Sequence, residues 1–202
     1  MSAVERALQA IRSGELVVIP TDTVYGLACT PYREPPVRAL SELKGRSPDQ
    51  PIALVAASVD WLLECVPELR GSAATAARAL LPGPFTLVLP NPACRFAWLA
   101  GASHKTLGVR VPAVDGVARD FLERAGAVAA TSANLHGGAD PRRLEDVPPE
   151  IMSGVTAAID GGELLGSPST VIDLTGPAPR VLREGAVSAA EALDRVRAAP
   201  GE

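Results

Sequence analysis

Short apolar runs alternate with helix-like segments along the chain, and this alternation restricts the fold more than any other feature. Interleaved strands and helices are typical of the α/β class. Because the runs are continuous, we expect a sheet covered on both faces, and short connections predict some antiparallel strands. The predicted strands are 16–19, 52–56, 85–89, 107–111, 127–130, 156–159, 170–174 and 180–182.

Capping signals place helices between these runs. Ser2 and Glu5 have capping-box spacing before a helix that Gly14 ends, and Ser188 and Glu191 have it before a helix to about residue 197. Further helices are predicted from Pro36 to near Gly45, from Ser58 through Leu63, and over 73–81 and 117–124. We predict a loop over 20–27 and a mobile surface loop over 135–149, which is rich in Gly, Pro and Arg.

The length of the chain suits one α/β domain over residues 1–202, or two small domains at most. Hydrophobic residues make up 47% and charged residues 21%, values that exclude wholesale disorder. The net charge of −4 counts against a nonspecific nucleic-acid binder. Cys29, Cys65 and Cys94 form no CxxC pair, so neither a disulfide framework nor a zinc site is expected. Without a membrane-length apolar run or a secretion signal, we expect a soluble, cytoplasmic protein with no membrane contact.

Several common catalytic motifs are missing from the sequence. There is no GxxxxGK[ST] loop, no GxGxxG after a strand, no GxSxG and no HExxH. His104 and His136 lie in polar segments, and we interpret both as solvated histidines. The pattern therefore does not favour a P-loop, dinucleotide-binding, serine-hydrolase or zinc-protease site.

Three polar segments stand beside predicted strands, where open α/β sheets place ligands. They are 21–23 with Tyr25, 131–134 and 167–170. The basic residues that stand nearby in the sequence are Lys44, Arg46, Arg110 and Arg183, and Lys44 and Arg46 also fit the C-terminal end of a helix. Hydroxyls, one amide and cations, with Asp22 as the carboxylate of the first segment, suit anions such as phosphate, carboxylate or bicarbonate. Taken singly, each segment also fits a helix cap or a turn.

The order of the motifs is more specific than any one of them. Between about residues 14 and 185 the chain reads PTDTVYGL, KGR, LPGPFTLVLP, GVRVP, TSAN, PSTVID and VLREG. This series resembles the threonylcarbamoyl-AMP synthase family, the YrdC-like proteins, in their short form. The resemblance implies a single YrdC-like domain, a twisted mixed open sheet flanked by helices, with a concave basic cleft.

The resemblance also implies an activity. The family makes threonylcarbamoyl-AMP and pyrophosphate from L-threonine, bicarbonate and ATP, with Mg²⁺ held mainly through the substrate phosphates. A tRNA-modifying threonylcarbamoyltransferase complex then uses the product, and weak contact with tRNA is an open expectation. Lys44 and Arg46 match the catalytic KxR pair. Expected threonine contacts are Thr23, Tyr25, Arg110, Thr131 and Ser169; expected ATP contacts are Lys44, Arg46, Ser132, Asn134, Thr170 and Arg183.

The sequence departs from the family pattern at three positions. Ser47 stands where Pro usually follows KxR, Val55 stands where a His often ends the next strand, and His136 replaces a Ser of SANxSG. Two other functions stay open at this point. One is a noncatalytic module that binds tRNA or double-stranded RNA, and the other is a carbamoyl-transferring relative, which usually carries companion domains.

Overall fold

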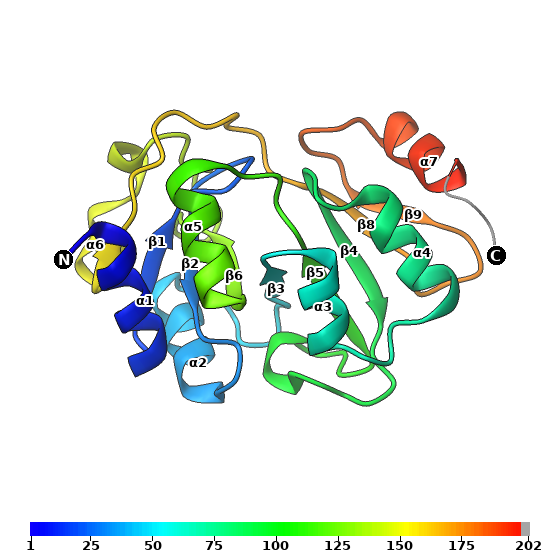
Figure 1. Cartoon of the computed structure of the whole chain (residues 1–202), viewed down its shortest axis with the longest axis horizontal. Helices are drawn as coiled ribbons and strands as arrows, with labels where there is room; N and C mark the ends of the chain where they lie inside the picture. The colour runs from blue at the N-terminus through cyan, green and yellow to red at the C-terminus, as the bar shows by residue number, and fades with distance from the viewer. Residues whose placement is uncertain (199–202) are drawn as a thin grey trace.

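A long twisted sheet forms the centre of the molecule (Figure 1). The computed structural model describes residues 1–198, apart from the side chain of Ser72. The strands are β1 (Val17–Ile19), β2 (Gly26–Cys29), β3 (Ala53–Ala56), β4 (Phe85–Pro90), β5 (Thr106–Arg110), β6 (Ala127–Ser132), β7 (Ala157–Ala158), β8 (Thr170–Asp173) and β9 (Arg180–Arg183). They form one nine-stranded sheet in the order β7-β1-β2-β6-β3-β5-β4-β8-β9, with both parallel and antiparallel pairs. The predicted mixed α/β fold is confirmed.

Helices connect most of these strands, and their ends follow the capping signals. The helices are α1 (Ala3–Ser13), α2 (Glu34–Leu43), α3 (Val59–Cys65), α4 (Gly71–Leu80), α5 (Gly116–Ala125), α6 (Pro149–Ser153) and α7 (Ala189–Arg197), with 3₁₀ turns η1 (Ala97–Leu99) and η2 (Leu144–Asp146). The predicted capping box of Ser2 and Glu5 is present at α1. Ser58 and Ser188 each accept a backbone N–H at the start of α3 and α7.

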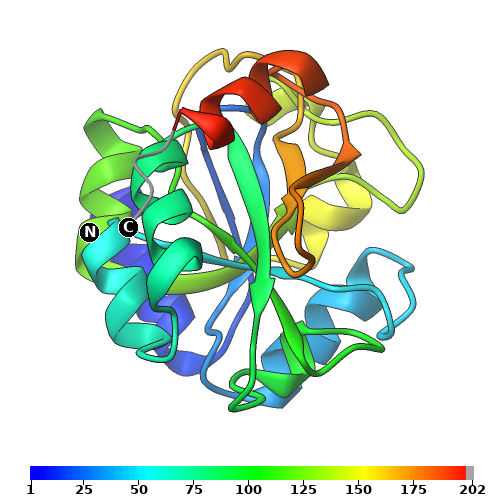
Figure 2. The same ribbon diagram turned by 90° about the vertical axis from the view of Figure 1, so that its right-hand side faces the viewer.

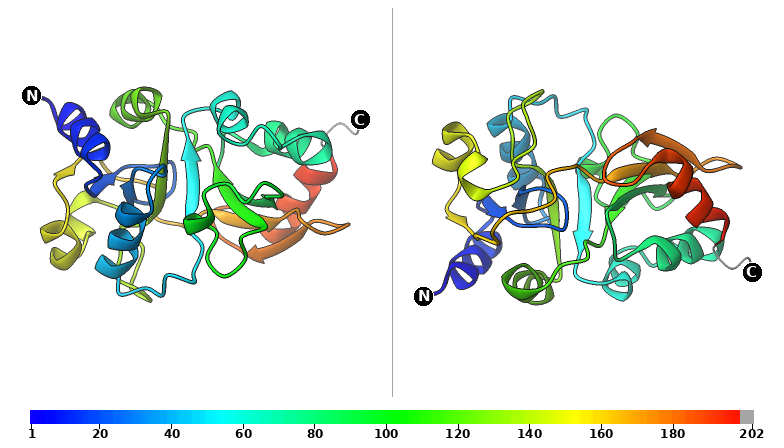
Figure 3. Two further views of the ribbon diagram at one scale, coloured as in Figure 1. Left: turned by 90° about the horizontal axis from the view of Figure 1, so that it is seen from below. Right: turned by 90° about the horizontal axis from the view of Figure 1, so that it is seen from above.

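Adjacent residues of the central strand β3 belong to different cores, because successive side chains of a strand point to opposite faces. Leu54 packs in the larger cluster with Leu40 of α2. Val55 packs in the second cluster with Leu8 of α1 and Phe121 of α5. Figure 3 shows α1 and α5 on one side of the sheet and α2 and α6 on the other. Helices therefore bury both faces of the sheet around β1, β2 and β6.

The sheet around β4 is covered differently. α4 contacts β4, and α7 contacts β8 and β9. In Figure 2, α3 and α4 lie on one side of β4 and the β8–β9 hairpin lies on the other. Along β4 the side chains of Phe85, Leu87 and Leu89 are buried, whereas Thr86 and Val88 are half-buried and border a cavity. The prediction of a sheet covered on both faces is wrong here, because a hollow replaces a helix layer.

Two predictions of loops are also wrong in part. Gly26 and Leu27 do not belong to a loop but to β2, which pairs with β1 and β6. Gly and Ala are weak strand formers, so tertiary pairing rather than local preference makes this strand. The predicted loop 135–149 contains η2, and α6 begins at its last residue. None of the helices within residues 1–198 combines the length and apolar character of a membrane span.

Candidate active site

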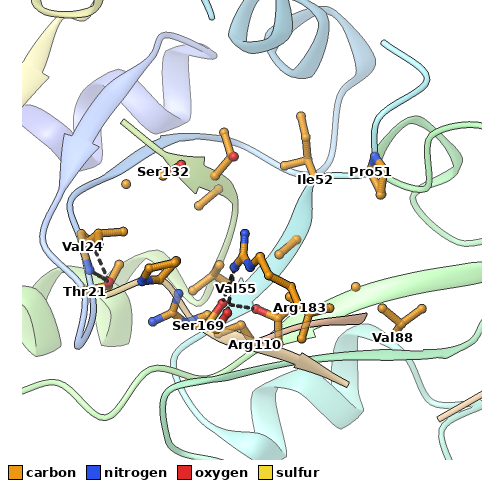
Figure 4. Close-up of a pocket in the computed structure, with 18 of the residues that line it drawn as sticks. Thr21, Val24, Pro51, Ile52, Val55, Val88, Arg110, Ser132, Ser169 and Arg183 are labelled. Atoms are coloured by element: carbon orange, nitrogen blue, oxygen red, sulfur yellow. Dashed lines mark hydrogen bonds between the residues drawn. The ribbon is translucent and has the colours of Figure 1, made fainter. Parts of the chain in front are cut away.

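A cavity of about 300 Å³ opens over β3, β4, β5, β6 and β8. Three arginines line it from separate parts of the chain: Arg46 after α2, Arg110 at the end of β5, and Arg183 at the end of β9. Figure 4 shows Arg110 and Arg183 beside Ser169, with the valine side chains of β3 and β4 nearby. The residues that line the cavity in the described structure include no carboxylate. The charged and polar side chains of the wall are therefore cations and alcohols, which suit anions, and apolar side chains such as Val55 and Val88 form the rest.

Arg110 is held by the loop after β1. Its Nη2 donates to Thr23 Oγ1 at 2.6 Å and forms an ion pair with Asp22. The second oxygen of Asp22, Oδ2, accepts the backbone N–H of Ala113 at 2.9 Å. Arg110 Nε is buried and finds no hydrogen-bond partner among the described residues. A buried N–H without a partner costs free energy, but this nitrogen is closed off from solvent, so other atoms of Arg110 form its part of the cavity wall.

Arg46 shows the same combination of anchored and unused donors. Its Nη1 donates to Thr131 Oγ1 at 3.1 Å, and its Nη2 donates to the carbonyl of Pro51. Its Nε is buried without a partner within residues 1–198. Burial also lowers the pKa of the Arg46 guanidinium. Arg46 and Arg110 thus both line the cavity, and each has a buried Nε without a partner among the described residues.

Arg183 is part of a chain of polar groups on the opposite wall. Its Nη2 donates to the carbonyl of Ser169 at 2.8 Å and to Ser169 Oγ at 3.2 Å. Ser169 Oγ in turn lies 2.8 Å from Thr86 Oγ1. Burial lowers the pKa of Arg183, and the negative charge of Asp140 opposes that shift. These bonds fix the direction of the guanidinium before any ligand binds.

Lys44 and Asn134, both predicted to contact ATP, are not among the residues that line the cavity. Lys44 Nζ donates to the carbonyl oxygens of Ser132 and Asn134 and to Asn134 Oδ1. Ser132 Oγ also donates to Asn134 Oδ1, at 2.7 Å. Of these three residues, only Ser132 reaches the cavity.

Three further predicted residues lie behind the wall. Tyr25 is fully buried; its hydroxyl donates to the carbonyl of Gly162 at 2.8 Å, and burial raises its pKa to about 12. Thr170 is also fully buried and donates to the carbonyl of Val187 at 2.5 Å. The hydroxyl oxygen of Thr23 accepts a hydrogen bond from Arg110 Nη2. The structure brings Arg46, Arg110, Thr131, Ser132, Ser169 and Arg183 to the cavity and places Thr23, Tyr25, Lys44, Asn134 and Thr170 behind it.

Thr21, in the predicted polar segment 21–23, also lines the cavity, and sequence reasoning missed two further hydroxyls there, those of Thr86 and Thr106. Thr86 could have been found from the sequence, because it is a polar residue within the apolar run of β4. A hydroxyl at such a position indicates that this face of the strand is not packed in the hydrophobic core. Val55, at the position where the family often has His, lines the cavity with an apolar surface. His136 contacts Lys44 through its backbone N–H, at 2.9 Å from the Lys44 carbonyl oxygen.

Comparison with known proteins decides the family. The Sua5/YciO/YrdC family model, described as telomere recombination, matches residues 9–185. The chain belongs to this family. A threonylcarbamoyl-AMP synthase of Methylococcus capsulatus (strain ATCC 33009 / NCIMB 11132 / Bath) is 40% identical over 131 residues, 65% of this chain and 70% of that protein.

Two comparisons concern Pyrococcus abyssi. A threonylcarbamoyl-AMP synthase of strain GE5 / Orsay is 38% identical over 177 residues, 87% of this chain and 52% of that protein. The crystal structure of P. abyssi Sua5 complexed with L-threonine matches with a TM-score of 0.87 and 35% identity, covering 98% of this chain and 58% of that one. This chain therefore spans little more than half the length of these two proteins.

Proposed function

We propose that this member of the family is an L-threonylcarbamoyladenylate synthase that acts as a single cytoplasmic domain. The observation that carries the proposal is the convergence of three arginines and several hydroxyl side chains, from separate parts of the chain, on one cavity. The relatives named threonylcarbamoyl-AMP synthase and the relative complexed with L-threonine support it. The reaction joins L-threonine, bicarbonate and ATP to give threonylcarbamoyl-AMP, pyrophosphate and water.

The threonine carboxylate is assigned to Arg110, which lines the cavity. Thr131 and Ser169 add hydroxyls to the same space, and Thr23 and Tyr25 support it from behind. The neutral amine of threonine attacks the carbon of bicarbonate, and water leaves to give a carbamate. Arginine suits the binding of the threonine carboxylate, because a planar guanidinium can donate two parallel hydrogen bonds to a carboxylate.

The triphosphate is assigned to Arg46 and Arg183, with Ser132 as a further donor. A carbamate oxygen then attacks the α-phosphorus of ATP, and pyrophosphate leaves. Several anions must approach one another, so the arginines contribute by reducing repulsion and by orienting the reactants. The lining residues of the described structure include neither carboxylate nor imidazole, so we assign proton transfer to substrate oxygens and water.

Mg²⁺ belongs to this proposal as a companion of ATP. Within residues 1–198, no group of three or more His, Cys, Asp and Glu side chains is placed to hold a metal ion. The ion fits the site only through phosphate oxygens and water, where it would neutralise phosphate charge. We further propose that a tRNA threonylcarbamoyltransferase complex consumes the product, with at most weak tRNA contact by this chain.

The test is release of pyrophosphate from ATP, with and without L-threonine and bicarbonate. We expect release only when both are present, and threonylcarbamoyl-AMP as the second product. Arg46→Met is expected to lower kcat/KM by about 100-fold, because it removes charge-assisted hydrogen bonds to phosphate. Arg78→Met is the matched control, since the Arg78 side chain is 58% exposed. ATP turnover that continues unchanged without threonine contradicts the proposal.

A further inference from the structure

Lys44 has no hydrogen-bond donor left for a ligand. Its Nζ lies 2.5 Å from the Ser132 carbonyl oxygen, 2.6 Å from the Asn134 carbonyl oxygen and 2.8 Å from Asn134 Oδ1. An ammonium group carries three N–H donors and cannot accept. The protein itself therefore uses the whole donor capacity of Lys44.

The position of Lys44 agrees with its hydrogen bonds. The residue is 4% exposed and does not line the cavity, although Arg46, two residues later, does. Arg46 keeps a buried Nε without a partner in the described residues, which is the opposite condition. Of the two cations of the KGR motif, Lys44 thus bonds to the protein, whereas Arg46 lines the cavity.

The partners of Lys44 belong to one short segment, residues 132–138, which we name the 132–138 turn. Besides the three bonds to Nζ, the Lys44 carbonyl oxygen accepts the N–H of His136 at 2.9 Å. Within the turn, Asn134 Nδ2 donates to the Gly138 carbonyl at 2.6 Å. Lys44 follows α2 directly, so these bonds join the end of that helix to the segment after β6.

We infer that Lys44 is a positioning residue that holds the 132–138 turn against α2, so that Thr131 and Ser132 face the cavity, and that it does not touch the triphosphate. This inference rests on the proposed function where it concerns ATP. The hydrogen bonds that carry it do not depend on any ligand.

Hydrogen exchange of the ligand-free protein tests the structural half. Lys44→Met keeps the length of the side chain and removes the three donors. We expect amides of the 132–138 turn to exchange at least about tenfold faster, because the turn loses three hydrogen bonds to a charged donor. Amides of α1 should not change, and Arg46→Met should leave the turn protected. Unchanged exchange of the turn in Lys44→Met overturns the inference.

A second variant guards against a protein that does not fold. Asn134→Leu removes the Oδ1 acceptor and leaves the two carbonyl acceptors of Lys44 in place. Exchange of the turn should again rise, by a smaller factor than in Lys44→Met. If neither the turn nor its surroundings respond to Asn134→Leu, the inference fails even without data on Lys44→Met.

Nucleotide affinity tests the functional half. A lost phosphate contact weakens ATP more than AMP, whereas a displaced turn weakens both nucleotides by the same factor. For Lys44→Met we expect an unchanged ratio of ATP to AMP affinity; for Arg46→Met we expect the ratio to fall by about tenfold. A selective loss of ATP affinity in Lys44→Met overturns the inference. If the unaltered chain binds neither nucleotide, the proposed function fails, and the exchange experiment still decides whether Lys44 holds the turn.

Discussion

At the scale of single residues, the ion pair of Asp22 and Arg110 joins stability to ligand binding. Both side chains are about nine-tenths buried, and each makes further hydrogen bonds, to Ala113 and to Thr23. A buried pair of this kind is costly to break, because the remaining charge has no counterion. Asp22 therefore compensates the charge of a buried cation that lines the cavity.

Removal of the carboxylate should lower stability markedly. Asp22→Ala is expected to reduce the free energy of unfolding by about 3 kcal/mol, since it leaves the guanidinium of Arg110 uncompensated. Urea denaturation at neutral pH measures the change. The control is Asp60→Ala, whose carboxylate pairs with Arg78 at the surface and is 81% exposed, and should cost no more than about 1 kcal/mol. Equal effects of the two variants would contradict the assigned role.

The pKa of Lys44 should lie below that of an ordinary lysine. Burial, and next the positive charge of Arg46, lower its pKa from 10.5 to about 8, while Asp140 acts in the other direction. The unfolded chain then binds this proton more tightly than the folded one. The contribution of Lys44 to the free energy of unfolding should accordingly increase between about pH 8 and pH 10.5.

The chain contains two lysines, Lys44 and Lys105, which makes this titration simple to observe. Carbon-detected NMR of the lysine Cε should show one resonance with a midpoint near pH 8. Lys44→Met should remove that resonance and Lys105→Arg should keep it. If no lysine resonance moves between pH 7 and pH 9, the buried environment of Lys44 is wrongly described.

Sequence identified the kinds of residue at the site better than their tasks. Arg46, Arg110 and Arg183 were predicted from the basic residues near the polar segments and from the order of the motifs, and all three line the cavity. Lys44 and Asn134 were expected to contact ATP, and in the structure Lys44 Nζ donates to Asn134 Oδ1. The sequence cannot separate these cases, because a donor that faces a ligand and a donor that faces a carbonyl look identical until the backbone is placed.

At the scale of elements, the wall that carries Ser169 and Arg183 depends on a close backbone approach at Gly185. A Cβ atom at this position would lie 2.2 Å from the Pro168 carbonyl oxygen and 2.8 Å from that of Ser169. The segment before β8 and the segment after β9 can therefore touch only because residue 185 has no side chain. The β8–β9 hairpin closes the cavity wall through this contact.

Gly185→Ala should separate the two segments. We expect a loss of about 2 kcal/mol in the free energy of unfolding, as for other overpacked sites, and weaker ATP binding because Ser169 and Arg183 move apart. Gly176→Ala is the matched control in the same hairpin, since its nearest neighbour lies 3.9 Å away. Thermal unfolding and nucleotide titration measure both effects. Similar results for the two variants would show that the contact is not tight.

Strong local sequence signals predicted most helices and strands. The prediction failed for elements whose local preference is weak and whose structure depends on pairing with distant segments. The caps at Ser2, Ser58 and Ser188 correctly placed three helices. The strand β2 was missed because its Gly, Leu, Ala and Cys residues carry little strand preference, and its pairing with β1 and β6 supplies the order. The prediction that the sheet is covered on both faces also failed around β4. A continuous apolar run does not show that Thr86 faces a cavity.

At the scale of the whole molecule, adjacent positions of β3 serve different purposes. Leu54 is fully buried in the larger core, whereas its neighbour Val55 packs in the second core and also borders the cavity. The central strand thus contributes to both cores and, through Val55, to the wall of the cavity.

Leu54→Ala should therefore destabilise without direct damage to the site. We expect the free energy of unfolding to fall by about 3 kcal/mol, the usual cost of such a cavity. Leu182→Ala, at a side chain that is 52% exposed, should change it by about 0.5 kcal/mol or less. Urea unfolding compares the two. A small effect of Leu54→Ala would place the main core elsewhere.

The cavity takes its walls from the first fifty residues of the chain, from its middle and from its last quarter. Arg183 enters only when β8 has paired with β4 and β9 with β8, close to the end of the sequence. A nascent chain that has not yet formed β9 therefore lacks a complete cavity, even if its earlier helices and strands have folded. Shortened products that stop before β9 would keep much of the sheet but lack Arg183, one of the two arginines that we assign to the triphosphate.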